Sequence, residues 1–124
     1  MREELELKSL RPEKFSEQIA WNEIEAFQNE VLRPILKYQN DLILSLTNKE
    51  PLFQKQISHV LTIDQKSDCI KRFFLLQPNY KHFLIGQICG LLTTSEFDFY
   101  LQSKKDIDKR ISNMLLDRIL SHYC

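Results

Sequence analysis

The chain has 124 residues, of which 43% are hydrophobic and 27% are charged, with 17 basic and 17 acidic side chains. This composition excludes a disordered or membrane-embedded chain, and the balanced charge gives no net field that would favour nucleic acid or an anionic membrane. Two glycines and four prolines are too few for a sheet protein with many tight turns, so we predict an all-α fold in a single domain.

The amino-terminal run MREELELKSLRPEKF has no apolar segment after its charges, so we expect no signal peptide. Three cysteines, Cys69, Cys89 and Cys124, form no CxxC pair and leave one cysteine over, which suits a reducing compartment. We therefore expect a cytoplasmic protein. Residues 1–12 are predicted to be a flexible or weakly docked arm, and residues 13–124 to be the helical bundle.

Hydrophobic spacing and helix-start signals predict about six helices. Their expected spans are 13–48, 51–61, 64–77, 79–92, a short helix after Thr93, and 106–122. Capping-box patterns, in which a threonine is followed three residues later by Gln or Glu, predict helix starts at Thr62 and Thr93.

The stretch from Phe27 to Ile43 contains the related sequences FQNEVL and YQNDLI, eleven residues apart. Eleven residues make close to three α-helical turns, so both copies are expected on one helix face. Pro34 lies between them and lacks the N–H that an α-helix requires. Either it kinks one long helix or it begins a new one, and the uninterrupted apolar row favours a long central helix kinked at Pro34.

Gln28 and Gln39 fall inside the apolar row of this stretch, whereas Arg33 is expected to face away from it. A buried amide without a hydrogen-bond partner costs roughly 1–3 kcal/mol, so both glutamines need partners. Three kinds of partner are open: the backbone or a loop of the same chain, a seam with a second subunit, or a polar ligand in a pocket.

From Phe83 to Ser95 the chain has no charged residue, which is typical of a helix in the middle of a bundle. Gly86 and Gly90 lie on one face of it, and each costs about 1 kcal/mol relative to alanine. We expect another helix to approach closely there. This helix and the central stretch are predicted to form the main core pair.

Chemical motifs are scarce. There is no phosphate loop, no HExxH and no nucleophile elbow, and the three histidines lack metal-ligand spacing, so we predict no catalytic residue, metal or cofactor. Arg118 and His122 fall inside the apolar stripe of the last helix. They are interpreted either as cations suited to a helix C-terminus, or, with Gln28 and Gln39, as a polar seam that binds a small anion or a second subunit.

Lys104, Lys105, Lys109 and Arg110 form a local basic cluster near the start of the last helix. Such a cluster is usually a solvated helix start. Its alternative interpretation, a nucleic-acid adaptor, lacks a recognition-helix pattern and an exposed aromatic platform.

The runs LRPILKYQNDLIL (32–44), FLIGQICGLLTTSEFDFYL (83–101) and KRISNMLLDRI (109–119) resemble a family of small all-helical bacterial proteins. The resemblance covers about residues 27 to 120. It implies no established activity and therefore transfers no catalytic residue.

These observations favour a non-catalytic helical interaction or scaffold protein whose partner is another protein or a second copy of the chain. The alternative is a small-ligand-binding or enzymatic bundle with a polar pocket around Gln28, Gln39 and Arg118. A nucleic-acid adaptor is the third hypothesis.

Overall fold

The computed structural model describes residues 4–11, 22–60 and 62–124. Every regular element in these ranges is helical, which confirms the all-α prediction. The elements are α1 (Glu4–Ser9), α2 (Glu23–Phe27), the π-helical segment η1 (Gln28–Leu32), α3 (Arg33–Tyr38), α4 (Asn40–Lys49), α5 (Pro51–Ile57), α6 (Ile63–Leu76), α7 (Pro78–Cys89), α8 (Thr94–Gln102) and α9 (Lys104–Tyr123). None of the helices in these ranges combines the length and apolar character that a membrane crossing requires.

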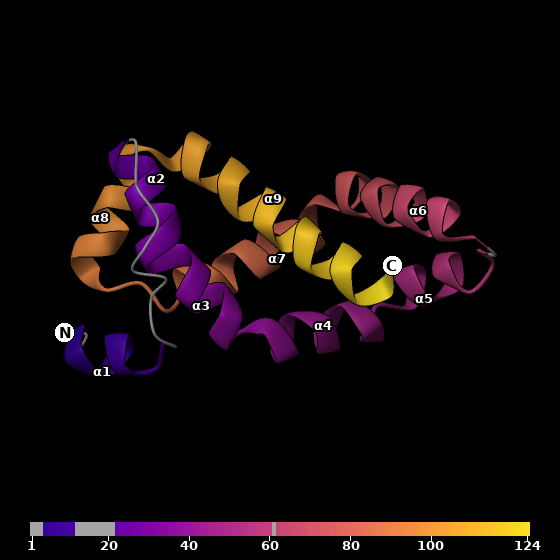
Figure 1. The fold of residues 1–124 in the computed structure, drawn as a ribbon, viewed down its shortest axis with the longest axis horizontal. Coiled ribbons are helices and arrows are strands. Elements are labelled where there is room, and N and C mark those ends of the chain that lie inside the picture. Colours follow the sequence, from indigo (N-terminus) through magenta and orange to yellow (C-terminus); the bar gives the residue numbers. More distant parts are fainter. Residues whose placement is uncertain (1–3, 12–21, 61) are drawn as a thin grey trace.

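The central stretch is divided into α2, η1, α3 and α4, so neither the count of six helices nor a long helix kinked at Pro34 is confirmed. The N–H of Arg33 bonds to the C=O of Gln28, five residues earlier, which gives this stretch a π-helical turn immediately before Pro34. The α-helical pattern is then interrupted at Gln39, where ψ is 1°. Figure 1 shows the change of direction there, between α3 and α4.

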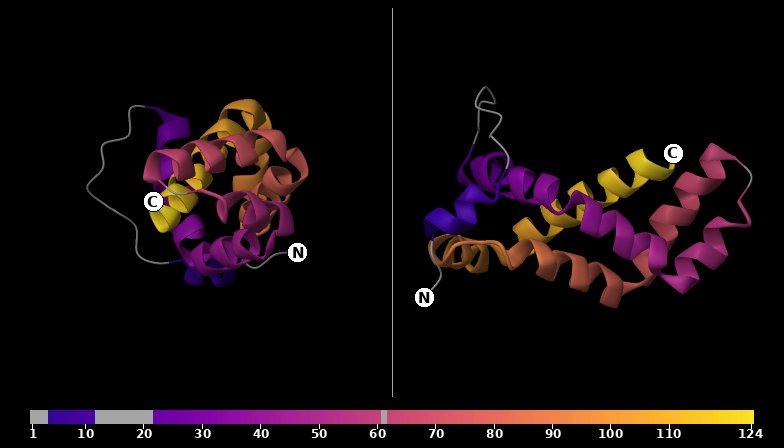
Figure 2. Two further views of the ribbon diagram at one scale, coloured as in Figure 1. Left: turned by 90° about the vertical axis from the view of Figure 1, so that its right-hand side faces the viewer. Right: turned by 90° about the horizontal axis from the view of Figure 1, so that it is seen from below.

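Helix α9 is the central packing element of the described residues. It contacts η1, α4, α6, α7 and α8, and it runs across the molecule from α8 toward the end where α5 lies (Figure 1). The central stretch and α7 were expected to form the main core pair. In the structure α9 packs against both of them, so the core also requires α9. Figure 2 shows an elongated molecule, with a compact outline end-on and a long one from below.

Side chains buried from solvent come from nearly every helix. The largest fully buried ones are Phe53, Leu32, Ile35, Leu36, Ile43, Ile70, Leu84, Ile88, Leu92, Ile107, Ile111 and Leu115. On α9 the buried positions Ile107, Ile111, Leu115 and Ile119 repeat every four residues, so one ridge of this helix faces the core. The neighbouring ridges of α9 remain available for other contacts.

Two helix starts follow the predicted capping chemistry. Thr93 accepts a hydrogen bond from the N–H of Glu96, and Glu96 accepts one from the N–H of Thr93, which completes the capping box that begins α8. Thr62 accepts from the N–H of Gln65 at the start of α6. Pro51 and Pro78 occupy the first turns of α5 and α7, where a missing N–H costs no intrahelical bond.

The expected close approach at the α7 glycines is wrong within the described residues. A Cβ added at Gly86 would meet nothing within 4 Å, and Gly86 is exposed. A Cβ at Gly90 would lie 3.3 Å from the carbonyl oxygen of Gly86, in its own helix. The uncharged stretch therefore has one buried face, formed by Leu84, Ile85 and Ile88, and one face that no described helix covers.

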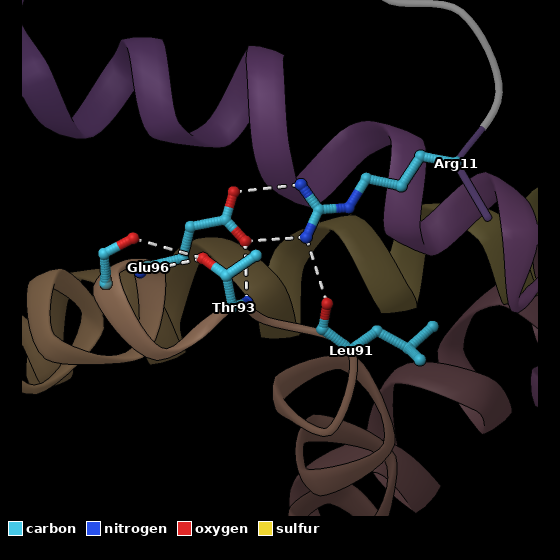
Figure 3. Close-up of polar contacts among 5 residues, drawn as sticks. Arg11, Leu91, Thr93 and Glu96 are labelled. Carbon is cyan, nitrogen blue, oxygen red and sulfur yellow. Dashed lines mark hydrogen bonds and ion pairs between the residues drawn. The ribbon is translucent and has the colours of Figure 1, made fainter. Parts of the chain in front are cut away.

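The amino-terminal segment contains helix α1, which the sequence pattern did not predict. Arg11 then lies against the start of α8, where its guanidinium bonds to both carboxylate oxygens of Glu96 and to the carbonyl oxygen of Leu91 (Figure 3). The predicted start of the first helix, at residue 13, falls in residues 12–21, outside the described residues.

Candidate functional site

A cleft of about 830 Å³ lies between α9 and the segments η1, α3 and α4. One wall consists of two adjacent ridges of α9, each with a residue at every fourth position: Asp106, Arg110, Met114, Arg118 and His122, and Lys109, Asn113, Asp117 and Ser121. The facing wall is formed by Gln28, Arg33, Asn40 and Leu44. These ridges flank the apolar ridge that anchors α9, so core packing fixes their orientation.

Three arginines in this cleft are held by neutral amide oxygens. Arg110 donates from Nη1 to Oε1 of Gln28 at 2.7 Å, and Arg118 donates from Nη1 to Oδ1 of Asn40 at 3.0 Å. Arg33 donates from Nε to Oδ1 of Asn29 at 2.8 Å, four residues earlier on its own helical stretch. An amide oxygen orients a guanidinium without neutralising its charge.

No carboxylate pairs with these arginines among the described residues. The ion pairs found there join Arg11 to Glu96 and Lys104 to Asp108. Burial lowers the pKa of Arg118, and the positive charge of Arg33 lowers it further. Arg33 and Arg118 line the same cleft, and an anion between them would reduce the repulsion of their like charges.

The atoms used for anchoring leave a two-donor edge on each guanidinium. Arg33 uses Nε, so its Nη1 and Nη2 groups remain together on one edge. Arg110 and Arg118 use Nη1, so each keeps the edge formed by Nε and Nη2. A paired edge of this kind matches the two oxygens of a carboxylate or phosphate, and such bonds are shorter and stronger than neutral ones.

Of the four side chains predicted to form a polar seam, Gln28, Arg118 and His122 line the cleft and Gln39 does not. Gln39 instead donates from Nε2 to the carbonyl oxygen of Gln87 on α7, at 3.3 Å. Both glutamines thus have partners in the same chain, the backbone for Gln39 and a side chain for Gln28.

Sequence reasoning missed two of the three anchored arginines. Arg33 was expected to face away from the apolar row, but it is half-buried in the cleft. Arg110 was grouped with a solvated basic cluster, but the structure places only part of that cluster in the cleft. Lys104 bonds to Asp108 at 2.5 Å and Lys105 is exposed outside the cleft, whereas Lys109 and Arg110 line it.

A smaller hollow of about 350 Å³ is lined by Cys89, Gly90, Leu92, Thr93, Thr94 and Phe97. Burial raises the pKa of the Cys89 thiol, which keeps it protonated and weakly nucleophilic. The described residues include no group of three His, Cys, Asp or Glu side chains arranged to hold a metal ion. The arginine cleft is accordingly the stronger candidate site.

Comparisons with protein families, with curated proteins and with solved structures found no match for the chain.

Proposed function

We propose that this protein binds a small oxyanionic ligand, one that carries carboxylate or phosphate groups, in the cleft between α9 and the η1–α4 stretch. The observation that carries the proposal is the set of three arginines, each anchored by a neutral amide oxygen and unpaired with any described carboxylate. Gathering partly buried positive charges in one cleft without a counter-ion is unfavourable, and an anion that binds there offsets that cost.

The size and composition of the cleft support a small molecule. Its volume of about 830 Å³ lies within the range of ligand sites. Its lining contains Lys109 and three arginines against Asp106 and Asp117, so positive charge predominates locally although the whole chain is neutral. The proposal concerns binding alone and includes no catalytic step.

Binding of inorganic phosphate and of citrate, measured by calorimetry at low and at physiological salt, tests this proposal. Replacing Arg33 or Arg118 with glutamine removes one charged two-donor contact, which is expected to weaken binding about ten- to hundredfold. The matched control is Lys105→Gln, which removes one positive charge from an exposed site on the same helix outside the cleft. Equal losses in all three variants would mean non-specific attraction and would refute an arginine site.

The interaction role predicted from the sequence is a second proposal, favoured by one observation. Gly86 costs about 1 kcal/mol in the middle of α7, and no described helix approaches it in compensation. Phe83, one turn away, is 56% exposed, and Leu42, on the neighbouring α4, is 50% exposed. We propose that a second copy of the chain packs on this face.

Sedimentation mass tests the second proposal independently of ligand binding. A dimer that dissociates when Leu42 is replaced with lysine supports it. The control is Leu75→Lys, which adds the same charge at an exposed leucine on α6. A monomer at all concentrations refutes self-association and leaves the anion proposal unaffected.

A further inference from the structure

Arg110, Met114 and Arg118 occupy successive positions, four residues apart, on the α9 ridge that lines the cleft. With a rise of 1.5 Å per residue, the two arginine Cα atoms are separated by about 12 Å along the helix axis. The side chain between them is apolar. We infer that the ligand is a bis-anion, a small molecule with two oxyanionic groups joined by an apolar linker, that bridges Arg110 and Arg118 across Met114. This inference rests on the proposed anion-binding function.

Each of the two arginines is fixed at its own end of the cleft. Gln28 holds the guanidinium of Arg110, and Asn40 holds that of Arg118, twelve residues further along the facing wall. Because separate anchors hold them, the two groups cannot converge on one oxyanion without breaking these hydrogen bonds. A ligand with two separated anionic groups could bind both guanidinium groups while these hydrogen bonds remain intact. Because the arginine side chains are already held in place, such a site loses little conformational entropy on binding.

Arg33 adds positive charge between these ends. Its anchor is Asn29, next in sequence to Gln28, and its charge also acts on Arg118. Positively charged side chains therefore lie between the two end sites as well as at each of them, and they outnumber the one carboxylate of that stretch, Asp117. A ligand with an apolar linker would contact Met114 there without placing a polar group against it.

The cleft is limited in length and lacks the features of a nucleic-acid site. Asp106 precedes Arg110 on the same ridge, so a longer polyanion would place a negative group against a carboxylate. Among the described residues no Phe, Tyr or Trp side chain lines the cleft, so none of these provides a platform on which bases could stack. The same acid–Arg–Met–Arg order favours a bounded ligand with two charged ends.

The test is a series of ligands graded in length. Straight-chain α,ω-dicarboxylates and α,ω-bisphosphonates with about two to ten methylenes are titrated by calorimetry beside the monoacids of the same chain lengths, since each added methylene also adds hydrophobic contact. We expect the diacids to show an affinity maximum at one length, at least about tenfold above the matched monoacid, because the second contact is intramolecular. The two headgroup series separate a carboxylate ligand from a phosphate ligand.

Variants at the two ends identify the contacts. Arg110→Gln and Arg118→Gln are each expected to lower diacid affinity to that of the monoacid and to abolish the length maximum, whereas Lys105→Gln retains both. Arg110→Lys keeps the charge without the two-donor edge and is expected to bind the best diacid with an intermediate affinity. The lysine variant also keeps the test valid if the glutamine variant fails to fold. Thermal unfolding of every variant shows directly whether a loss of binding comes from a loss of folding.

The outcomes separate this inference from the proposal beneath it. If monoacids and diacids bind equally at every length and both are lost in Arg33→Gln, the anion site stands and the bis-anion inference is overturned. A diacid affinity that rises with every methylene, in parallel with the monoacids, also overturns it, since that indicates apolar contact alone. If no member of either series binds, both the inference and the anion site are refuted.

Discussion

The contact between Arg11 and Glu96 gives the most direct test of how the amino-terminal segment is attached. Arg11 donates to the two carboxylate oxygens of Glu96 at 2.9 and 2.6 Å and to the carbonyl oxygen of Leu91 at 3.0 Å (Figure 3). The side chains of Arg11 and Glu96 are only 8% and 13% exposed. We predict that Arg11→Gln destabilises the protein, because the nearly buried carboxylate of Glu96 then lacks its cation.

The size of this effect follows from what Glu96 retains. Removing one member of a fully buried ion pair costs about 3–5 kcal/mol, but Glu96 keeps its hydrogen bond from the N–H of Thr93 at 2.9 Å. We therefore expect a loss of about 2–3 kcal/mol in unfolding free energy. For a chain of this length that corresponds to a decrease of roughly 6–12 °C in the unfolding midpoint, measured by calorimetry or circular dichroism.

The pH dependence of the same variant provides a second measurement. Burial raises the pKa of Glu96, but hydrogen bonds from Arg11 and Thr93 outweigh it, so the pKa is lowered on balance. A carboxyl group with a lowered pKa in the folded state stabilises the protein above its unfolded pKa of about 4.3, and that contribution is lost as the pH falls through the folded value. The difference between wild type and Arg11→Gln should therefore shrink below about pH 4.

Two results would refute this reasoning. A change of less than about 2 °C at pH 7 would mean that Arg11 does not hold the amino-terminal segment against α8 in solution. A large change that persists undiminished at pH 3 would mean that the loss comes from packing of the arginine stem rather than from the ion pair. The double variant Arg11→Gln/Glu96→Gln should cost less than the sum of its parts, because the two residues interact directly.

Three further predictions concern the helices and the cleft. In the monomer, Gly86→Ala should raise the unfolding free energy by about 0.5–1 kcal/mol, since its Cβ meets nothing within 4 Å of the same chain and alanine is the better helix former; an unchanged unfolding midpoint at concentrations where the chain is monomeric would contradict this. In denaturant titrations, Thr47→Val should lower the unfolding free energy by about 1–3 kcal/mol and Tyr80→Phe by about 0.5–1.5 kcal/mol. The valine variant loses more because the Thr47 hydroxyl donates to the Ile43 carbonyl, and valine would leave the Tyr80 hydroxyl buried without an acceptor. Asn40→Asp should raise the unfolding midpoint at neutral pH by pairing with Arg118, and should weaken phosphate binding at least about tenfold in calorimetry.

Features set by neighbouring residues could be predicted from the sequence. The Thr93 capping box, the proline at the start of α5 and the apolar ridge of α9 each depend on residues within about one turn of one another or on an unbroken 3.6-residue period. Along α9 the period is regular over 20 residues. Arg118 and His122, both expected inside the apolar stripe, lie on the cleft-lining ridge beside it, where Arg118 is half-buried and His122 is exposed.

The central stretch could not be predicted in the same way because its period is not constant. The π-helical segment Gln28–Leu32 holds more residues per turn than an α-helix, which rotates every later side chain relative to a 3.6-residue wheel. Gln28 and Gln39 were consequently expected on one face, yet one contacts α9 and the other contacts α7. The same rotation brings Arg33 into the cleft. No local signal distinguished a π-helical turn from a kink at Pro34.

The partners of the cleft arginines bear directly on whether the cleft exists for binding. Asparagine and glutamine have nearly the same shape as aspartate and glutamate, so an acid could stand at position 28, 29 or 40 and make the same hydrogen bond with an added charge. Stability alone would favour the acid, because a charge-assisted hydrogen bond is stronger than a neutral one. Three amides at these positions instead orient three guanidinium groups without neutralising their charge. Sites that are less stable than another residue choice would make them are expected to be functional. If Asn40→Asp bound phosphate as tightly as the wild type, this reasoning would fail, and the amides would be ordinary surface partners.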